Sequence, residues 1–272
     1  MIKTLYNGLT ALVLALLPLN ANSEKYTIGV VPQFEARELV DIWGHVASTL
    51  TNNTPYDFEF VGSANIPDFE KKFQNGDFDF IYSNPYHALM AYQQEGYIPI
   101  IRDGSRMLKG ILVARKDSEI HSISDLNGAL ISFPAPNALG ASLMTRSDMT
   151  LKYNLTYTEE YVKTHSSAYL NVFLKESDAA GGVMSSYNKL DDLVSSKLKI
   201  IYETQGVPPH PISAHPRLPA EVVDSVSNTI QNFAKFPNGG ITLSRIPMYD
   251  PVATSMEEYL GLADLTLENF VK

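Results

Sequence analysis

The sequence predicts an α/β fold that is divided into two lobes with a cleft between them. Segments with the patterns of strands and helices alternate along most of the chain, which favours mostly parallel sheets flanked by helices. The proline-rich run Gly206–Pro219 follows this alternation. Because proline fixes φ and lacks an amide hydrogen, the run predicts a stiff extended connection rather than a helix or a central strand. We interpret it as a return connection between two lobes that close on a ligand.

The predicted strands are short segments that are rich in β-branched and aromatic residues or that alternate between apolar and polar residues. The first ends at Pro32, and Asp57–Val61 shows the alternation. The predicted strands are 26–31, 57–61, 77–82, 98–101, 110–115, 129–133, 157–162, 179–184 and 197–203.

The predicted helices are recognised by apolar spacing and by their end signals. Apolar residues recur at helical spacing between Leu39 and Leu50. Asn65 is expected to cap the next helix, with Pro67 in its first turn and Gly76 at its end. The predicted helices are 37–50, 66–75, one that opens within 83–87 and ends at 95, 138–152, 166–176, 186–194 and, as the final element, 219–236; a turn or single helical turn is expected at 124–128.

Residues 1–23 predict an export signal that is cleaved. Lys3 gives a positive start, Leu9–Leu19 is almost wholly apolar, and the small residues Ala21 and Ser23 suit cleavage. The apolar run is shorter than the roughly 20 residues that span a bilayer, and Pro18 interrupts it. The alternative is a segment that stays attached as an uncleaved anchor.

The composition of the chain indicates its compartment and the kinds of partner to expect. The chain has no cysteine, which excludes disulfides, thiolate metal sites and the cysteine that a lipoprotein needs, and which suits an oxidising compartment. We therefore expect a periplasmic protein that is not lipid-anchored. The net charge of −9 argues against nucleic acid as a partner. It does not exclude a small anionic ligand, because nearby dipoles and side chains set the potential of a cleft.

Three strand-to-helix loops are the candidate ligand site, because ligands of α/β sheets lie at the carboxyl ends of strands. These loops are Tyr82–His87, Phe133–Gly140 and Lys163–Ser167. Each opens a helix, whose first amides lack partners and whose dipole is positive there, so an oxyanion can be held without lysine or arginine. We expect helix beginnings from opposing lobes to converge on one gap. The candidate ligand-binding residues are Tyr82, Asn84, Tyr86, His87, Asn137, Ala138, Leu139, Gly140, His165 and Ser166.

Each of these residues also has a purely structural interpretation. Serine and asparagine at helix starts are simple caps about as often as they are ligand-binding residues. Tyr82 and Tyr86 fit a hydrophobic core, and a lone histidine such as His165 is more often structural than functional. The binding interpretation is favoured because the three loops occupy equivalent places in the α/β pattern.

Several segments resemble the periplasmic solute-binding proteins of phosphate, phosphite and phosphonate ABC transporters. The resemblance runs in order through nearly all of the mature chain. Its segments are Asp79–Tyr82 with Asn84–Tyr86, Gly110–Ser118, Ile123–Gly128, Phe133–Arg146, Thr164–Ser166 and Val207–Pro219. It implies a type II periplasmic-binding-protein fold, in which two crossing strands form a hinge and ligand in the cleft favours closure. It also implies that 24–107 plus 206–272 form the first lobe and 108–205 the second.

The chain departs from the family pattern at the turn after 129–133. Phosphonate binders of the family carry Ser-Thr-Ser-Gly there, whereas this chain has Ala138–Ala141, preceded by Asn137. The hydroxyls are missing and the backbone amides remain; each hydrogen bond to a charged group contributes about 1.5–3 kcal/mol. The acidic residue that holds the amine of the ligand in some members aligns near Met184 or Ser185, so an aminophosphonate is less expected.

The predicted function is the capture of a small phosphorus oxyanion, such as a phosphonate, phosphite or phosphate-like ion, by a monomer that serves an ABC permease. One alternative is a sensory binding protein that reports to a membrane receptor. The other is an enzyme on the same scaffold, but the sequence lacks nucleophile-elbow, P-loop and dinucleotide motifs. His210 and His215 flank prolines without the helical spacing of metal ligands, so neither metal nor cofactor is expected.

Overall fold

The computed structural model describes residues 25–272. The predicted export signal, 1–23, lies outside them. Within the described residues, no helix combines the length and apolar character that crossing a membrane requires.

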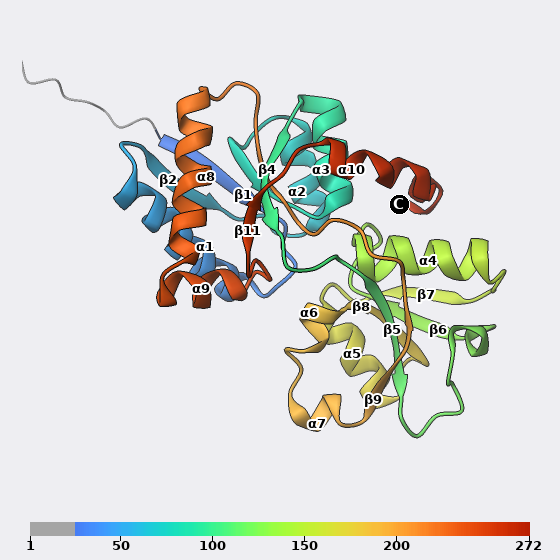
Figure 1. The fold of residues 1–272 in the computed structure, drawn as a ribbon. Coiled ribbons are helices and arrows are strands. Elements are labelled where there is room, and N and C mark those ends of the chain that lie inside the picture. Colours follow the sequence, from blue (N-terminus) through green and yellow to red (C-terminus); the bar gives the residue numbers. More distant parts are fainter. Residues whose placement is uncertain (1–24) are drawn as a thin grey trace, which may run out of the picture.

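Two separate sheets form the two lobes of an α/β fold, as predicted (Figure 1). The larger sheet has six strands in the order β11-β4-β10-β3-β1-β2, and the smaller has five in the order β7-β6-β8-β5-β9. The strands of the larger sheet are β1 (Lys25–Val30), β2 (Asp57–Val61), β3 (Phe80–Tyr82), β4 (Ile98–Asp103), β10 (Ile212–Ala214) and β11 (Pro251–Ala253). Those of the smaller sheet are β5 (Gly110–Arg115), β6 (Leu130–Phe133), β7 (Thr158–Tyr161), β8 (Ala179–Val183) and β9 (Leu198–Glu203).

Both sheets are mixed, whereas the sequence pattern suggested mostly parallel strands. The strand β1 is parallel to β2 and β3, and β6 is parallel to β7 and β8, while β10, β11, β5 and β9 pair antiparallel with their neighbours. The reason is the path between the lobes. The chain leaves through β4 into β5 and returns from β9 into β10, so outgoing and returning strands run in opposite directions.

The strand β10 corrects the interpretation of the proline-rich run, because it lies in the middle of the larger sheet between β4 and β3. Its three residues fall between Pro211 and Pro216 and all have amide hydrogens, so the prolines do not interrupt the ladder. Before β10 the run is extended. There Leu108 and Val207 exchange backbone hydrogen bonds of 2.8 and 2.9 Å, which joins the two crossing segments.

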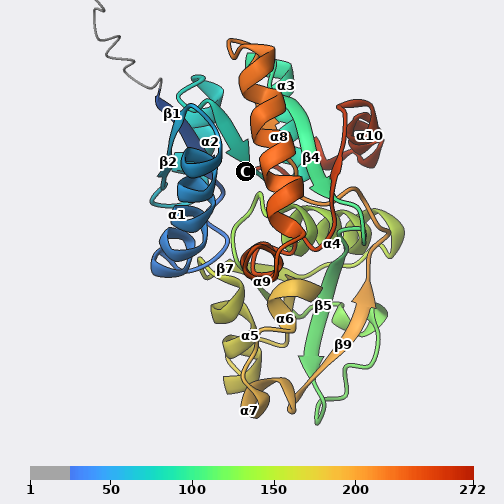
Figure 2. The same cartoon turned by 60° about the vertical axis from the view of Figure 1, so that its left-hand side comes forward.

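Helices flank both sheets. In the larger lobe α1 packs beside α8 and α9 on the left of Figure 1, while α2 and α3 pack together to the right of them (Figures 1 and 2). Asn65 caps α2 by accepting from the amide of Asp68 at 2.9 Å, and Gly96 ends α3 in the left-handed conformation, as predicted. The helices are α1 (Ala36–Asn53), α2 (Ile66–Gln74), α3 (Pro85–Glu95), α5 (His165–Leu174), α8 (Ala220–Ala234) and α9 (Pro237–Ser244).

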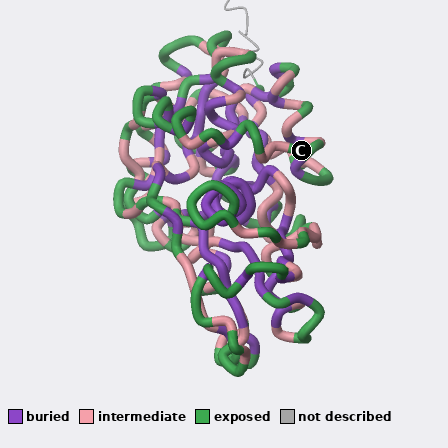
Figure 3. The backbone as a smooth tube through the Cα atoms, turned by 90° about the vertical axis from the view of Figure 1, so that its right-hand side faces the viewer, coloured by how far each residue is buried: buried purple, intermediate pink, exposed green. Residues whose placement is uncertain are grey.

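The predicted helix 138–152 is confirmed, with an unusual hydrogen-bond pattern. It consists of η2 (Leu139–Met144), α4 (Thr145–Ser147) and η3 (Asp148–Lys152), and its two outer parts are π-helical. Its first two turns are fully buried, and the segment is seen nearly end-on in the middle of Figure 3. It therefore lies at the centre of the molecule, next to the junction of the lobes.

Two helix predictions are wrong. The segment 186–194 is not one helix but α6 (Met184–Tyr187) and α7 (Asp192–Ser195), because Asp191 accepts from the amide of Leu193 at 2.8 Å and starts a new helix. The helix 219–236 is not the final element. After α8 the chain forms α9, β11, α10 (Glu257–Leu260), η4 (Gly261–Leu265) and η5 (Leu267–Phe270).

The C-terminal segment 254–272 contacts both lobes. Tyr259, Leu262 and Leu267 belong to an apolar cluster that also contains Leu89 of α3 and Leu143 of the central helical segment. The guanidinium of Arg146 donates to the carbonyl of Phe270 at 2.6 Å. This segment is therefore a third connection between the lobes, besides the two crossing segments.

Candidate functional site

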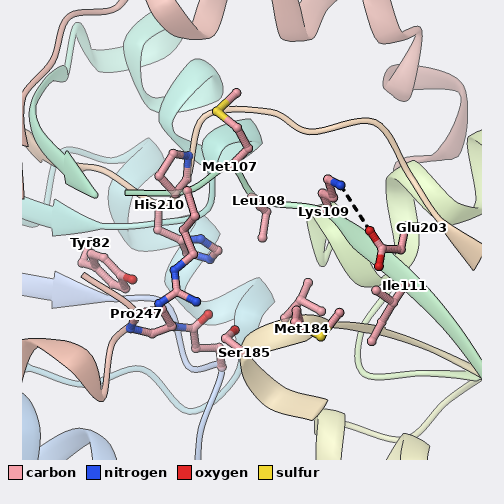
Figure 4. A pocket seen from close by; sticks show the side chains of 14 residues that line it. Tyr82, Met107, Leu108, Lys109, Ile111, Met184, Ser185, Glu203, His210 and Pro247 are labelled. Atoms are coloured by element: carbon pink, nitrogen blue, oxygen red, sulfur yellow. Dashed lines mark hydrogen bonds and ion pairs between the residues drawn. The ribbon is translucent and has the colours of Figure 1, made fainter. Parts of the chain in front are cut away.

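Two adjoining cavities lie between the lobes. The larger has a volume of about 260 Å³ and the smaller of about 30 Å³. They share Gln33, Val183 and His210 in their walls. Figure 4 shows the larger one, with Tyr82 and His210 on one side and Met184 and Glu203 on the other.

The smaller cavity is built around helix beginnings. Ala138–Ala141, at the start of η2, and His165, at the start of α5, reach it from the smaller lobe. Asn84, the N-cap of α3, reaches it from the larger lobe. Among the described residues, the amides of Leu139 and Gly140 find no acceptor. The cavity is therefore lined by unpaired N–H groups at the positive ends of helices.

Glycines on the neighbouring strands allow the start of η2 to lie this deep. A Cβ atom on Gly110 of β5 would stand 2.0 Å from the carbonyl oxygen of Gly140. One on Gly181 of β8 would stand 2.1 Å from that of Ala141. The hydroxyl of Ser142 donates to the carbonyl of Ala135 at 2.6 Å and closes the preceding loop. Close backbone contact thus fixes the position of the amides.

The charge of the smaller cavity suits an anion. Of the residues that the structure describes, the titratable ones in the cavity walls are Lys163, His165 and His210, and none is a carboxylate. Lys163 is exposed, has a left-handed backbone with φ of 75°, and has no ion-pair partner in the described part of the chain. Burial lowers the pKa of His165 to about 4 and that of His210 to about 3, so both rings are neutral near pH 7. The positive charge therefore comes from Lys163 and the helix ends.

A hydrogen-bonded chain holds the ring of His165. Its Nδ1 lies 3.2 Å from Oγ of Ser186, which in turn donates to the carbonyl of Val183 at 2.9 Å. The hydroxyl of Tyr169 lies 2.9 Å from the same Oγ. This anchoring on one ring nitrogen leaves Nε2 of His165 without a partner among the described residues.

Six of the ten candidate residues line the two cavities. Asn84, Ala138, Leu139, Gly140 and His165 line the smaller and Tyr82 the larger. The hydroxyl of Tyr82 donates to the carbonyl of Ile246 at 2.6 Å, and its ring stacks on His210 at 5.5 Å. Tyr82 therefore contributes a ring face to the cavity, while its hydroxyl proton is already donated to the carbonyl of Ile246.

The other four candidates lie outside the cavity walls, and their part in binding stays a prediction. His87 is buried beside Phe69 and Phe73, with Nε2 2.9 Å from Oε1 of Glu70. Tyr86 packs on the apolar cluster of the C-terminal segment, and Ser166 is exposed on α5.

Asn137 is occupied by other contacts. Its Nδ2 donates to Glu70 and to the carbonyl of Lys272, both at 3.1 Å, and its Oδ1 accepts from the amide of Lys272 at 3.1 Å. In this structure Asn137 ties the two lobes and the C-terminal segment together.

Gln33, Lys163 and His210 are among the residues of the cavity walls that sequence reasoning missed. Gln33 follows the first predicted strand and precedes the first predicted helix, so the strand-to-helix loop rule would have found it. His210 was weighed only as a metal ligand. Among the described residues, no cluster of three or more histidines, cysteines and carboxylates is arranged to hold a metal ion.

The family of the chain follows from a match that extends from β1, through the central helical segment, to beyond β11. Residues 28–259 match the family described as "ABC transporter, phosphonate, periplasmic substrate-binding protein". The chain belongs to this phosphonate-binding family. Among curated proteins, none matches the chain.

Solved structures of low sequence identity to this chain share its fold. A binding protein component of an ABC phosphonate transporter from Pseudomonas aeruginosa has a TM-score of 0.79 at 16% identity, over 90% of this chain and 86% of that one. PhnD1 from Prochlorococcus marinus, in complex with methylphosphonate, has a TM-score of 0.80 at 14% identity, over 90% and 98%. A Xanthomonas citri protein bound to chloride has a TM-score of 0.72 at 13% identity, over 91% and 99%. The fold that this chain shares with the first two is the two-lobed type II periplasmic-binding-protein fold.

Proposed function

We propose that this chain captures a phosphonate or a related small phosphorus oxyanion in the smaller cavity and delivers it to an ABC permease. In this proposal the protein is a binding protein and not an enzyme. It reaches the periplasm after cleavage of residues 1–23, acts as a monomer and carries no lipid anchor.

One observation carries the proposal. Within residues 25–272, the amides of Leu139 and Gly140, Nε2 of His165 and the ammonium of Lys163 have no partner, and they surround one cavity that no carboxylate of these residues lines. Helix beginnings hold oxyanions through such amides, and each charge-assisted hydrogen bond is about twice as strong as a neutral one.

The size of the smaller cavity supports binding by closure. About 30 Å³ holds roughly two to three water-sized groups at 10–15 Å³ each, which leaves no spare room around the three oxygens of a phosphonate head. The lobes therefore have to separate to admit the head group and then close on it. We place the hinge at the crossing segments that Leu108 and Val207 join, between a first lobe of 24–107 plus 206–272 and a second of 108–205.

Ligand binding to the exported protein tests the proposal. Thermal unfolding is followed with methylphosphonate, phosphite, phosphate and sulfate. A bound ligand at a hundred times its Kd raises the free energy of unfolding by about 2.7 kcal/mol. Stabilisation by at least one phosphorus oxyanion but not by an uncharged phosphonate diester supports the proposal. A flat response to all four anions overturns it.

A further inference from the structure

We propose that the ligand is a phosphonate whose substituent is uncharged, apolar and larger than methyl, and that this substituent occupies the larger cavity. The inference rests on the proposed function, because it takes the smaller cavity as the seat of the oxyanion.

The two cavities adjoin and share three wall residues. Val183 borders both volumes from the smaller lobe, and Gln33 and His210 border both from the larger lobe. A phosphonate whose oxygens face Leu139 and Gly140 has one remaining direction on phosphorus, which is its carbon substituent. The open volume beside the head group is the larger cavity.

The walls of the larger cavity are mainly apolar. Met107 and Leu108 come from the outgoing crossing segment, Pro209 from the returning one, and Ile111 and Met184 from the smaller lobe (Figure 4). Its volume of about 260 Å³ exceeds the roughly 150 Å³ that accommodates benzene in an apolar cavity. A methyl group leaves most of this space unfilled, whereas a chain of several methylenes or a ring fills it.

The charged groups of the larger cavity already have partners. Nζ of Lys109 lies 3.2 Å from Oε2 of Glu203, the only carboxylate in the walls described (Figure 4). Nε of Arg106 lies 3.2 Å from Oδ2 of Asp103, and its guanidinium lies 3.7 Å from the ring centre of Tyr249. An ammonium group on the substituent would meet no free carboxylate and would have to break the Lys109–Glu203 pair.

A series of alkylphosphonates tests the inference by calorimetry. We expect the Kd to fall by about fourfold for each methylene that is fully buried, and by at least about tenfold from methyl- to butylphosphonate. 2-Aminoethylphosphonate should bind more weakly than propylphosphonate, which has the same length. If the Kd stays constant or rises along the series while methylphosphonate binds measurably, the inference is overturned and the proposed function stays intact. Absence of binding by every phosphonate in the series overturns both.

A variant locates the substituent. Met184→Gln keeps the length of the side chain and makes the wall polar, so the ratio of butyl- to methylphosphonate affinity should fall by about fivefold or more. Leu174→Gln is the matched control, because Leu174 ends α5 in the same lobe with 60% of its surface exposed. The control should keep the ratio of the unchanged protein. An equal ratio in both variants places the substituent outside the larger cavity and overturns the inference.

Discussion

Lys163 shows how one exposed residue can set the local charge of an acidic protein. The chain carries a net charge of −9, yet the described walls of its smaller cavity contain a cation and no carboxylate. The loop that contains Lys163 was predicted as part of the site, but the residue itself was not. The amides alone seemed sufficient for an oxyanion, and nothing in the sequence indicates that this lysine lacks an ion-pair partner.

Replacement of Lys163 tests its contribution to anion binding. Lys163→Gln should weaken methylphosphonate binding by about twofold to fivefold, since exposed charges interact at about 1 kcal/mol or less in salt. The variant should also show a weaker dependence of Kd on salt. Lys175→Gln is the control, because Lys175 has a left-handed backbone too, with φ of 68°, at the other end of α5. Equal effects of the two substitutions on Kd would contradict a specific role.

The neutral histidines predict how stability depends on pH. The folded-state pKa values of His165 and His210, about 4 and about 3, lie below the ordinary value of 6.5. Between pH 6.5 and 4 the unfolded chain therefore binds protons that the folded chain does not. The free energy of unfolding should fall as the pH falls through this range, by at most about 1.4 kcal/mol per pH unit for each histidine.

His210→Gln removes one of these two titrations. Urea unfolding at pH 7, 6 and 5 should show a shallower loss of stability in the variant than in the unchanged protein. An identical pH slope would mean that His210 does not stay neutral in the fold.

At the scale of elements, local signals predicted most helices and strands. Caps and stops such as Asn65 and Gly96 act within one turn, so the sequence alone reveals them. The helix α9 escaped prediction because it contains Gly239 and Gly240, and glycine in a helix costs about 1 kcal/mol relative to alanine. The central place of β10 escaped because strand order is decided by the path between the lobes, which no local pattern encodes.

The close contact of η2 with the smaller sheet gives a prediction on both stability and binding. The Cβ atom of Gly181→Ala would meet the carbonyl of Ala141 at 2.1 Å and the ring of Phe133 at 2.5 Å. Overpacking of this kind costs about 1–3 kcal/mol, and it displaces the amides that face the smaller cavity. We expect lower urea stability together with weaker methylphosphonate binding.

Gly44→Ala is the matched control. A Cβ atom on Gly44, inside α1, would have no neighbour within 4 Å. This substitution should raise the free energy of unfolding by about 0.5–1 kcal/mol and leave binding unchanged. If Gly181→Ala behaved like Gly44→Ala, the close approach of η2 would not position the site.

At the scale of the whole molecule, the lobes are joined by two crossing segments and by the C-terminal segment 254–272. The sequence resemblance implied the two crossings, which Leu108 and Val207 connect. It did not indicate the third connection, because contacts such as that of Arg146 with the carbonyl of Phe270 depend on long-range packing.

Deletion of residues 266–272 tests the third connection. It removes the buried side chain of Leu267, the partner of Arg146 and the ion pair of Lys272 with Glu159. Without ligand, we expect a larger radius of gyration by X-ray scattering and a lower melting temperature, because fewer contacts hold the lobes together. A radius of gyration equal to that of the full chain would show that the crossings alone fix the lobe arrangement.

The contact of Lys272 with Asn137 has a practical consequence. Asn137 directly precedes Ala138–Ala141, so a guest that draws these amides toward itself also shifts the groups that hold Lys272. An affinity tag fused after Lys272 would thus stand beside Asn137 and is expected to change the ligand affinity that it is used to measure. For the same reason, an environment-sensitive dye attached at that position is well placed to signal occupancy of the protein by a change in its emission.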